Sequence, residues 1–304
     1  MNRKGSVYVL LAGISWGMMG LFVITLYDSG LETLQIVSLR SVSAALIMLG
    51  YVGFKDPKIL RISLSDLPVF VMVSLFSVVF FSYCFFSTIQ ETSLSIAVTL
   101  LYTAPTFVTI LSRIFFKEWL TPQKIIALLT TFLGLTLVTG FLGGEGTITV
   151  RGLATGLGSG LGYGLFSILG KVILRKYKPL TLATYTFVIA AVILLPTLAF
   201  ALPGPGPMGF GFYRDVFLLG LVPTAIAYIF YAKGLETMES SLASITATVE
   251  PVVGALIGVL VFKEVLSSSQ VTGMLLVLLS VIILQVDDNL LKNTHKKITY
   301  AFKK

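Results

Sequence analysis

The stretch Leu67–Ile89, LPVFVMVSLFSVVFFSYCFFSTI, decides the fold, because it runs for 23 residues without a charged side chain. The hydrocarbon core of a bilayer is about 30 Å thick, and a helix rising 1.5 Å per residue needs about 20 apolar residues to cross it. This stretch is long enough to cross, and stretches of similar character recur along the chain. We therefore predict an all-α integral membrane protein.

The composition of the whole chain agrees with a surface that faces lipid. Charged residues make up 12% of the 304 residues and apolar residues make up 56%, whereas about a quarter of an ordinary soluble domain is charged. Too few polar residues are present to cover a water-facing surface, which excludes a soluble enzyme and a disordered linker. The net charge of +8 comes from short basic clusters between apolar segments, so we expect a lipid bilayer and no nucleic acid as partner.

Residues that bind metals or assist nucleophiles are scarce. The one cysteine, Cys84, lies in an apolar stretch, and the one histidine, His295, lies in a Lys-rich tail. These two residues supply neither a His/Cys metal site nor the histidine of a Ser–His–Asp hydrolase, and the phosphate loop of an ATP-driven pump does not occur. We therefore expect no catalytic residues, no metal and no cofactor, and an intramembrane enzyme is disfavoured.

A 20-residue window finds ten candidate spans joined mostly by short connections, so neighbouring spans should be antiparallel. We place the spans near 6–27, 33–54, 67–89, 93–116, 122–141, 152–174, 179–202, 216–234, 240–262 and 267–285. The longest connection, Pro203–Tyr213, alternates proline and glycine at its start and is predicted to be non-helical.

The distribution of Lys and Arg predicts the orientation. With the N-terminus inside, eighteen of the 22 basic residues fall on the cytoplasmic side, and only Arg151, Arg214 and Lys263 fall outside; Arg40 lies within a span. Because cytoplasmic loops are enriched in Lys and Arg, we predict a multi-pass protein of the cytoplasmic membrane with both termini in the cytoplasm.

The second half of the chain repeats the first. Phe-Lys-Glu-Trp-Leu at 116–120 recurs as Phe-Lys-Glu-Val-Leu at 262–266, an offset of 146. Further matches at offsets of 145 to 147 pair Gly13, Trp16 and Gly17 with Gly160, Tyr163 and Gly164, Pro105 with Pro251, and Tyr83 with Tyr228. Five spans per half is an odd number, so the halves would cross the membrane in opposite directions. We predict two inverted five-helix repeats, 1–145 and 146–288, followed by a basic cytoplasmic tail, 289–304.

The chain resembles the drug/metabolite transporter superfamily, in particular its ten-helix EamA type. The resemblance rests on Ser15-Trp16-Gly17, Arg40, Pro105, Pro251 and the two Phe-Lys-Glu-x-Leu sequences. It implies a metabolite carrier, often an exporter of amino acids or related compounds, with a central cavity between two five-helix halves.

Glu250 is the main candidate for coupling transport to protons. It lies about ten residues into the ninth span, or about 15 Å deep, where an ionised carboxylate costs about 2.5–3.5 kcal/mol. We expect this carboxyl group to be protonated or paired with a cation. Pro251 follows and removes a backbone N–H. A proton-coupling or ammonium-binding site is one interpretation, and a fixed hydrogen bond to a neighbouring helix is the other.

Arg40 and several aromatic residues are candidates for the wall of the cavity. Arg40 lies at a depth similar to that of Glu250, so the two side chains would pair or hold the two ends of a zwitterion; alternatively, Arg40 extends to the outer surface. The aromatic candidates are Trp16, Tyr83, Tyr102, Tyr163 and Tyr228, for which packing against neighbouring helices is the alternative. Pro105 and Pro251 are the candidate hinges.

Two further patterns have structural alternatives. The glycines at positions 152, 156, 160 and 164 form one smooth helix face, which suits packing between the halves or the interface of a homodimer; the oligomeric state, monomer or homodimer, stays open. Lys117-Glu118 and Lys263-Glu264 lie at span ends and are interpreted as ion pairs that fix helix depth or as gates.

Together these observations predict a secondary transporter that moves a small organic substrate, an amino acid or related amphipathic compound, out of the cell by alternating access, with protons as a candidate coupling ion. Efflux of cationic or aromatic drugs by the same fold is the alternative within transporters. A channel is the alternative outside them.

Overall fold

The computed structural model describes residues 3–92, 94–139, 149–199, 209–263 and 265–285, and in these ranges every regular element is helical. The first half contains α1 (Arg3–Gly17), α2 (Met19–Asp28), α3 (Thr33–Lys55), α4 (Leu67–Ser74), η3 (Leu75–Phe80), α5 (Phe81–Glu91), α6 (Leu94–Leu101), α7 (Ala104–Phe116) and α8 (Pro122–Val138). The second half contains α9 (Val150–Leu174), α10 (Pro179–Ala199), α11 (Phe210–Gly220), η5 (Leu221–Ile226), α12 (Ala227–Thr237), α13 (Ser240–Thr246), η6 (Ala247–Val249), α14 (Glu250–Phe262) and α15 (Ser268–Gln285). Short 3₁₀ turns, η1 (Pro57–Leu60) and η2 (Leu64–Asp66), connect α3 to α4.

These helices form the ten predicted apolar segments. Eight segments are long and apolar enough to cross a membrane, and the shorter apolar helices α8 and α15 complete the set. The predicted boundaries agree with the structure to within a few residues at most ends. The eighth segment differs, because its helix begins at Phe210, inside the connection that we predicted to be non-helical. The prolines of that connection end at Pro207, so nothing in the sequence prevents a helix from starting three residues later.

Two segments are interrupted at matching positions. The fourth breaks between α6 and α7, and the ninth passes through the 3₁₀ turn η6 between α13 and α14. Pro105 and Pro251 each occupy the second position of the helix that follows the break, where a missing backbone N–H costs nothing. Each proline therefore starts a second helix and does not kink a continuous one.

Glycine faces of α1 and α9 cover these two breaks. A methyl group added at Gly13 of α1 would lie 2.6 Å from Cγ1 of Val249 and 3.0 Å from the carbonyl oxygen of Ala247. In a regular helix, that carbonyl would accept a hydrogen bond from the N–H of residue 251, which Pro251 lacks. Only a residue without a side chain permits so close an approach.

The same arrangement recurs at the other break. A methyl group at Gly160 of α9 would lie 2.4 Å from Oγ1 of Thr103 and 3.2 Å from the carbonyl oxygen of Leu101, which is the group that Pro105 leaves without its helical donor. The first helix of each half thus packs against the interrupted helix of the other half.

Other local features recur 146 residues apart. The π-helical turns η3 and η5 start at Leu75 and Leu221, and the left-handed residues that end α7 and α14 are Lys117 and Lys263, with φ of 58° and 60°. The predicted boundary between the halves at 145/146 and the predicted tail, 289–304, lie outside the described residues.

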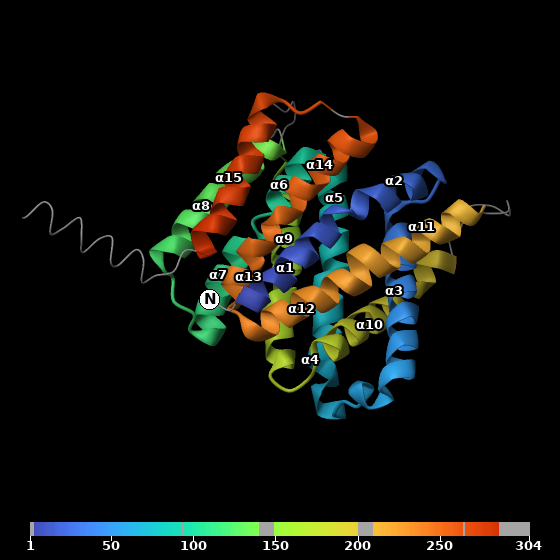
Figure 1. Ribbon diagram of the computed structural model, residues 1–304. Coiled ribbons are helices and arrows are strands. Elements are labelled where there is room, and N and C mark those ends of the chain that lie inside the picture. The colour runs from blue at the N-terminus through green and yellow to red at the C-terminus, as the bar shows by residue number, and fades with distance from the viewer. Residues whose placement is uncertain (1–2, 93, 140–148, 200–208, 264, 286–304) are drawn as a thin grey trace, which may run out of the picture.

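The helices α8 and α15 pack side by side at one end of the molecule (Figure 1). Gly134 and Gly273 allow their backbones to approach closely, since a methyl group at Gly273 would lie 2.5 Å from the carbonyl oxygen of Gly134. Thr131 also donates a buried hydrogen bond to Ser280, with 2.7 Å between the hydroxyl oxygens. The main buried cluster, which includes Trp16 and Tyr228, is formed mainly by α1, α3, α4, α9, α10 and α12.

This packing predicts that Gly17→Ala destabilises the protein. The new methyl group would lie 2.6 Å from Cβ of Val253 and 2.7 Å from the carbonyl oxygen of Glu250, so α1 and α14 must separate, at a cost of about 1–3 kcal/mol. We expect a lower midpoint of thermal unfolding for the detergent-purified protein. Gly53→Ala is the matched control, because nothing lies within 4 Å of the added methyl group and alanine favours a helix. Equal midpoints for the two variants would contradict the close contact.

Candidate functional site

An aromatic cluster lies where α1, α9 and α12 meet. The Trp16 ring of α1 is 5.9 Å from Tyr163, 5.3 Å from Tyr228 and 5.1 Å from Tyr231, measured between ring centroids. Phe166 of α9 stands edge-on to Tyr228 at 5.0 Å. Offset and edge-to-face pairs of this kind are the favoured geometries for aromatic rings, so the cluster is a well-ordered wall.

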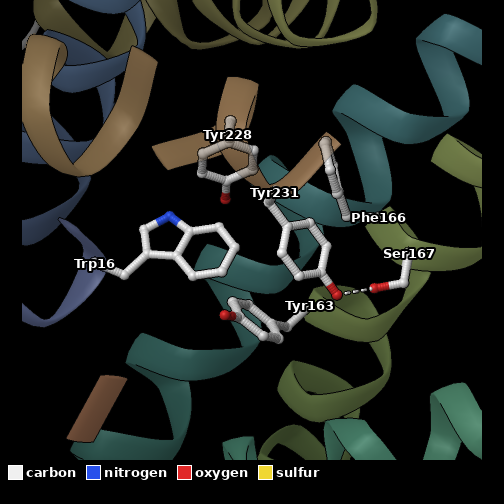
Figure 2. Close-up of a pocket in the computed structure, with 6 residues that line it drawn as sticks. All are labelled: Trp16, Tyr163, Phe166, Ser167, Tyr228 and Tyr231. Carbon is white, nitrogen blue, oxygen red and sulfur yellow. Dashed lines mark hydrogen bonds between the residues drawn. The ribbon is translucent and has the colours of Figure 1, made fainter. Parts of the chain in front are cut away.

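The cluster lines a small pocket, together with Ser167 of α9. Figure 2 shows the tyrosine rings gathered in front of Trp16, and Ser167 joined to Tyr231 by a hydrogen bond with 2.7 Å between the oxygens. The internal volume is about 10 Å³, which is at the lower limit for one water molecule. The polar hydroxyl groups and the rings give the pocket both hydrogen-bonding and apolar surface.

Glu250 adjoins this cluster. It is the first residue of α14, so its position is set by the break in the ninth segment, and its side chain is half-buried. The hydroxyl group of Tyr163 donates a hydrogen bond to Oε2 of Glu250 at 3.2 Å. Within the described residues, Oε1 of Glu250 accepts no hydrogen bond from the protein. The carboxyl group therefore keeps capacity to bind a proton or a ligand.

Arg40 lies on the helix face of α3 that packs into the same core. Val37, Ala44 and Met48 on this face belong to the buried cluster that contains Trp16 and Tyr228, and a residue at position 40 shares their face by the spacing of three and four. Arg40 is 6% exposed. Its guanidinium Nη1 lies 4.0 Å from the sulfur of Met19, and its Nε has no hydrogen-bond partner.

No ion pair joins Arg40 to any acid in the described part of the chain. Arg40 and Glu250 therefore do not form a direct ion pair.

The structure brings most of the predicted site residues together. Trp16, Tyr163 and Tyr228 form the cluster, with Glu250 and Arg40 beside it. Tyr102 is 7% exposed and belongs to a separate buried cluster, with Leu135 and Val252. Tyr83 is not brought to the site, because 61% of its side chain is exposed.

Sequence reasoning missed three lining residues, Phe166, Ser167 and Tyr231. The signal that was available is helical spacing: positions three and four after Tyr163, and three after Tyr228, must share the faces of those residues. Tyr231 aligns with Phe86 at the offset of 145 that pairs Tyr83 with Tyr228, whereas Phe166 and Ser167 have no residue of their own type at the matching positions of the first half.

A second polar network joins the halves away from the cluster. The carboxylate of Glu118, which is 8% exposed, accepts hydrogen bonds from the backbone N–H groups of Ser240 at 2.8 Å and Ser241 at 3.2 Å, and from the Ser241 hydroxyl group at 2.6 Å. Lys124 is 3% exposed, lies 4.0 Å from Glu118 and also pairs with Glu239. The connection between α7 and α8 is thereby fastened to the start of α13. Glu264, the predicted counterpart of Glu118, lies outside the described residues.

The arrangement suits reversible binding of a small molecule. Within the described ranges, no group of three His, Cys, Asp or Glu side chains is placed to hold a metal ion. What the site offers is a carboxyl group, a guanidinium group and aromatic faces between two sets of helices.

Comparisons with known proteins identify relatives over nearly the whole chain. A family model described as the EamA-like transporter family matches twice, at residues 3–140 and 150–286. An uncharacterized transporter of Archaeoglobus fulgidus is 30% identical over 73% of this chain and 79% of its own, and a second one is 28% identical over 92% and 96%. An uncharacterized inner membrane transporter, YicL of Salmonella typhimurium, is 24% identical over 94% and 96%.

A solved structure titled "Crystal structure of protein" has the same fold, with a TM-score of 0.80, 17% sequence identity and coverage of 93% of this chain and 96% of its own. The helices, the apolar segments and the two matches of the family model agree, and the chain belongs to the EamA-like transporter family of multi-pass membrane proteins.

Proposed function

We propose that this transporter moves a small organic metabolite, an amino acid or a related amphipathic compound, out of the cell by alternating access and in exchange for protons. The observation that carries the proposal is Glu250, an acid at the break of an interrupted membrane helix, bonded to Tyr163 beside an aromatic pocket. Interrupted helices that place a binding site near the middle of the membrane are typical of secondary transporters.

The reciprocal packing of the halves supports opposite orientations. Gly13 approaches the break beside Glu250, and Gly160 approaches the break beside Ala104. Because each half has five spans, a two-fold axis that relates the halves would lie in the membrane plane, and such an axis would account for this reciprocity. With the charge distribution of the loops, it supports our assignment of both termini to the cytoplasm.

The size of the pocket supports movement of the halves. A space for about one water molecule does not hold a metabolite, so the halves must separate to admit a substrate. Polar contacts cross between them at both ends. Glu118–Ser241 and Asp66–Lys176 lie on the proposed cytoplasmic side, and Glu91–Arg151 lies on the proposed outer side.

Efflux of cationic aromatic drugs is a second candidate, because the Trp16 and Tyr163 rings beside Glu250 would attract a flat cation. A channel is a third candidate, and saturation of transport distinguishes it from a carrier.

Glu250→Gln tests proton coupling. The amide keeps the shape of the side chain but binds no proton in the accessible range, so substrate-driven proton movement should be abolished. We would reconstitute the protein in liposomes with an internal pH-sensitive dye and add each proteinogenic L-amino acid and, separately, tetraphenylphosphonium. Wild type should show saturable pH changes with at least one amino acid.

Glu236→Gln is the matched control, because this acid lies exposed at the end of α12 and should leave coupling unchanged. Coupling that persists in Glu250→Gln contradicts the proton role. A response to tetraphenylphosphonium alone selects drug efflux, and flux that does not saturate selects a channel.

Glu118→Ala tests the cytoplasmic contacts. Removing this carboxylate leaves buried N–H groups at the start of α13 without acceptors, at about 1–3 kcal/mol each, which should shift the protein towards the state open to the cytoplasm. With Cys84→Ser and Ser167→Cys as background, we expect faster labelling of position 167 by a membrane-impermeant maleimide from the cytoplasmic side.

Glu91→Ala is the corresponding variant on the proposed outer side. Its pair with Arg151 is 3.0 Å long and partly exposed, and surface pairs of this kind contribute little. We expect a smaller effect in the opposite direction, with faster labelling from the outside. Equal labelling from both sides in both variants would contradict alternating access.

A further inference from the structure

Arg40 is a buried cation that pairs with no acid in the part of the chain that the structure describes. It is 6% exposed, its Nε makes no hydrogen bond, and within the described residues it has no acid in ion-pair range. Lys124, which is also deeply buried, has Glu118 and Glu239 as partners. A buried charge is costly unless an opposite charge compensates for it, so Arg40 has unused capacity for an anion.

The position of Arg40 directs this capacity to the aromatic pocket. Its helix face packs into the cluster that contains Trp16 and Tyr228, and its Nη1 touches Met19, which packs against the same cluster. Glu250 lies beside the same cluster, bonded to Tyr163. The Trp16 ring lies 5.9 Å from Tyr163, which is bonded to Glu250, and belongs to the same buried cluster as the helix face that carries Arg40.

We propose that Arg40 and Glu250 form the two ends of a zwitterion site, in which Arg40 binds the carboxylate of the substrate, Glu250 binds its ammonium group, and Trp16 contacts its apolar part. This inference rests on the proposed transport function and narrows its substrate class to α-amino acids. A guanidinium group binds a carboxylate through two parallel hydrogen bonds. The same cation repels a substrate that has only a positive charge, which disfavours cationic drugs.

The test uses purified protein in nanodiscs and measures binding, so that it does not depend on transport. The probes are the proteinogenic L-amino acids and, for the one that binds best, its decarboxylated amine and its deaminated acid. Wild type should bind the complete amino acid at least about tenfold more tightly than either analogue, as expected for the loss of one charge-assisted pair.

The variants separate the two ends of the site. Arg40→Gln should weaken amino acid binding at least about tenfold and leave binding of the amine unchanged or stronger, because the repelling charge is gone. Glu250→Gln should weaken amino acid binding and spare the deaminated acid. Arg40→Lys should bind the amino acid with intermediate affinity, since lysine keeps the positive charge but cannot donate two parallel hydrogen bonds as a guanidinium group does. Arg175→Gln, the same change at an exposed position, should bind as wild type does.

Several results would overturn the inference. One is wild-type protein that binds no amino acid, and another is wild type that binds the amine as tightly as the amino acid. A third is an Arg40→Gln variant that prefers the amino acid over its amine as strongly as wild type does. If Arg40→Gln does not fold, the same result with Arg40→Lys would overturn the inference. Binding as expected without any flux in liposomes would contradict the transport proposal and leave the zwitterion site in place. Saturable flux of an amine that is the same in wild type and in the Arg40 variants would support transport and contradict the zwitterion site.

Discussion

A polypeptide inside lipid must satisfy its backbone hydrogen-bonding groups within the protein, and this constraint governs the centre of the molecule. Two helices are interrupted there, before Pro105 and before Pro251. An interrupted helix within the membrane is tolerated only where other parts of the protein pack against the interruption. The glycine faces of α1 and α9 pack there. Because each glycine face packs on a break in the other half, the two halves contact each other where their backbone hydrogen bonding is interrupted.

The site is a consequence of this packing. Trp16 lies between Gly13 and Gly17 on α1, and Tyr163 lies next to Gly164 on α9. The close approach of these helices to the breaks therefore brings both rings to Glu250, which begins the helix after the second break. Arg40 reaches the cluster from α3 without touching Glu250. Two opposite charges that are held apart in a low-dielectric interior retain their attraction for a ligand, whereas a direct pair would neutralise itself.

The sequence predicted what depends on local pattern. Lengths of apolar runs predicted the ten segments, and the repeat offset paired Pro105 with Pro251 as candidate hinges, next to which the structure has breaks. Glu250, Trp16 and Tyr163 were selected from their depth and repeat positions. It did not predict which face each aromatic residue occupies. Tyr83 and Tyr228 match in the repeat, but Tyr83 is 61% exposed and Tyr228 is 4% exposed. Helix rotation is fixed by contacts between distant segments, such as Trp16 with Tyr231, which no local pattern encodes. The network of Glu118 with Ser240 and Ser241 depends on such contacts as well.

The departures from the repeat are more informative about function than the matches. The residue 146 positions before Glu250 is Ala104, and the residue 146 positions after Arg40 is Thr186, so neither charge has a charged counterpart. The glycines that cover the breaks (Gly13 with Gly160, and Gly17 with Gly164), the two prolines and the left-handed lysines do have counterparts. The two unmatched charges also come from different halves. A substrate bound to both would connect the halves across the pocket, so its binding energy would favour the closed arrangement, and release would require one half to move away from the charge that it carries.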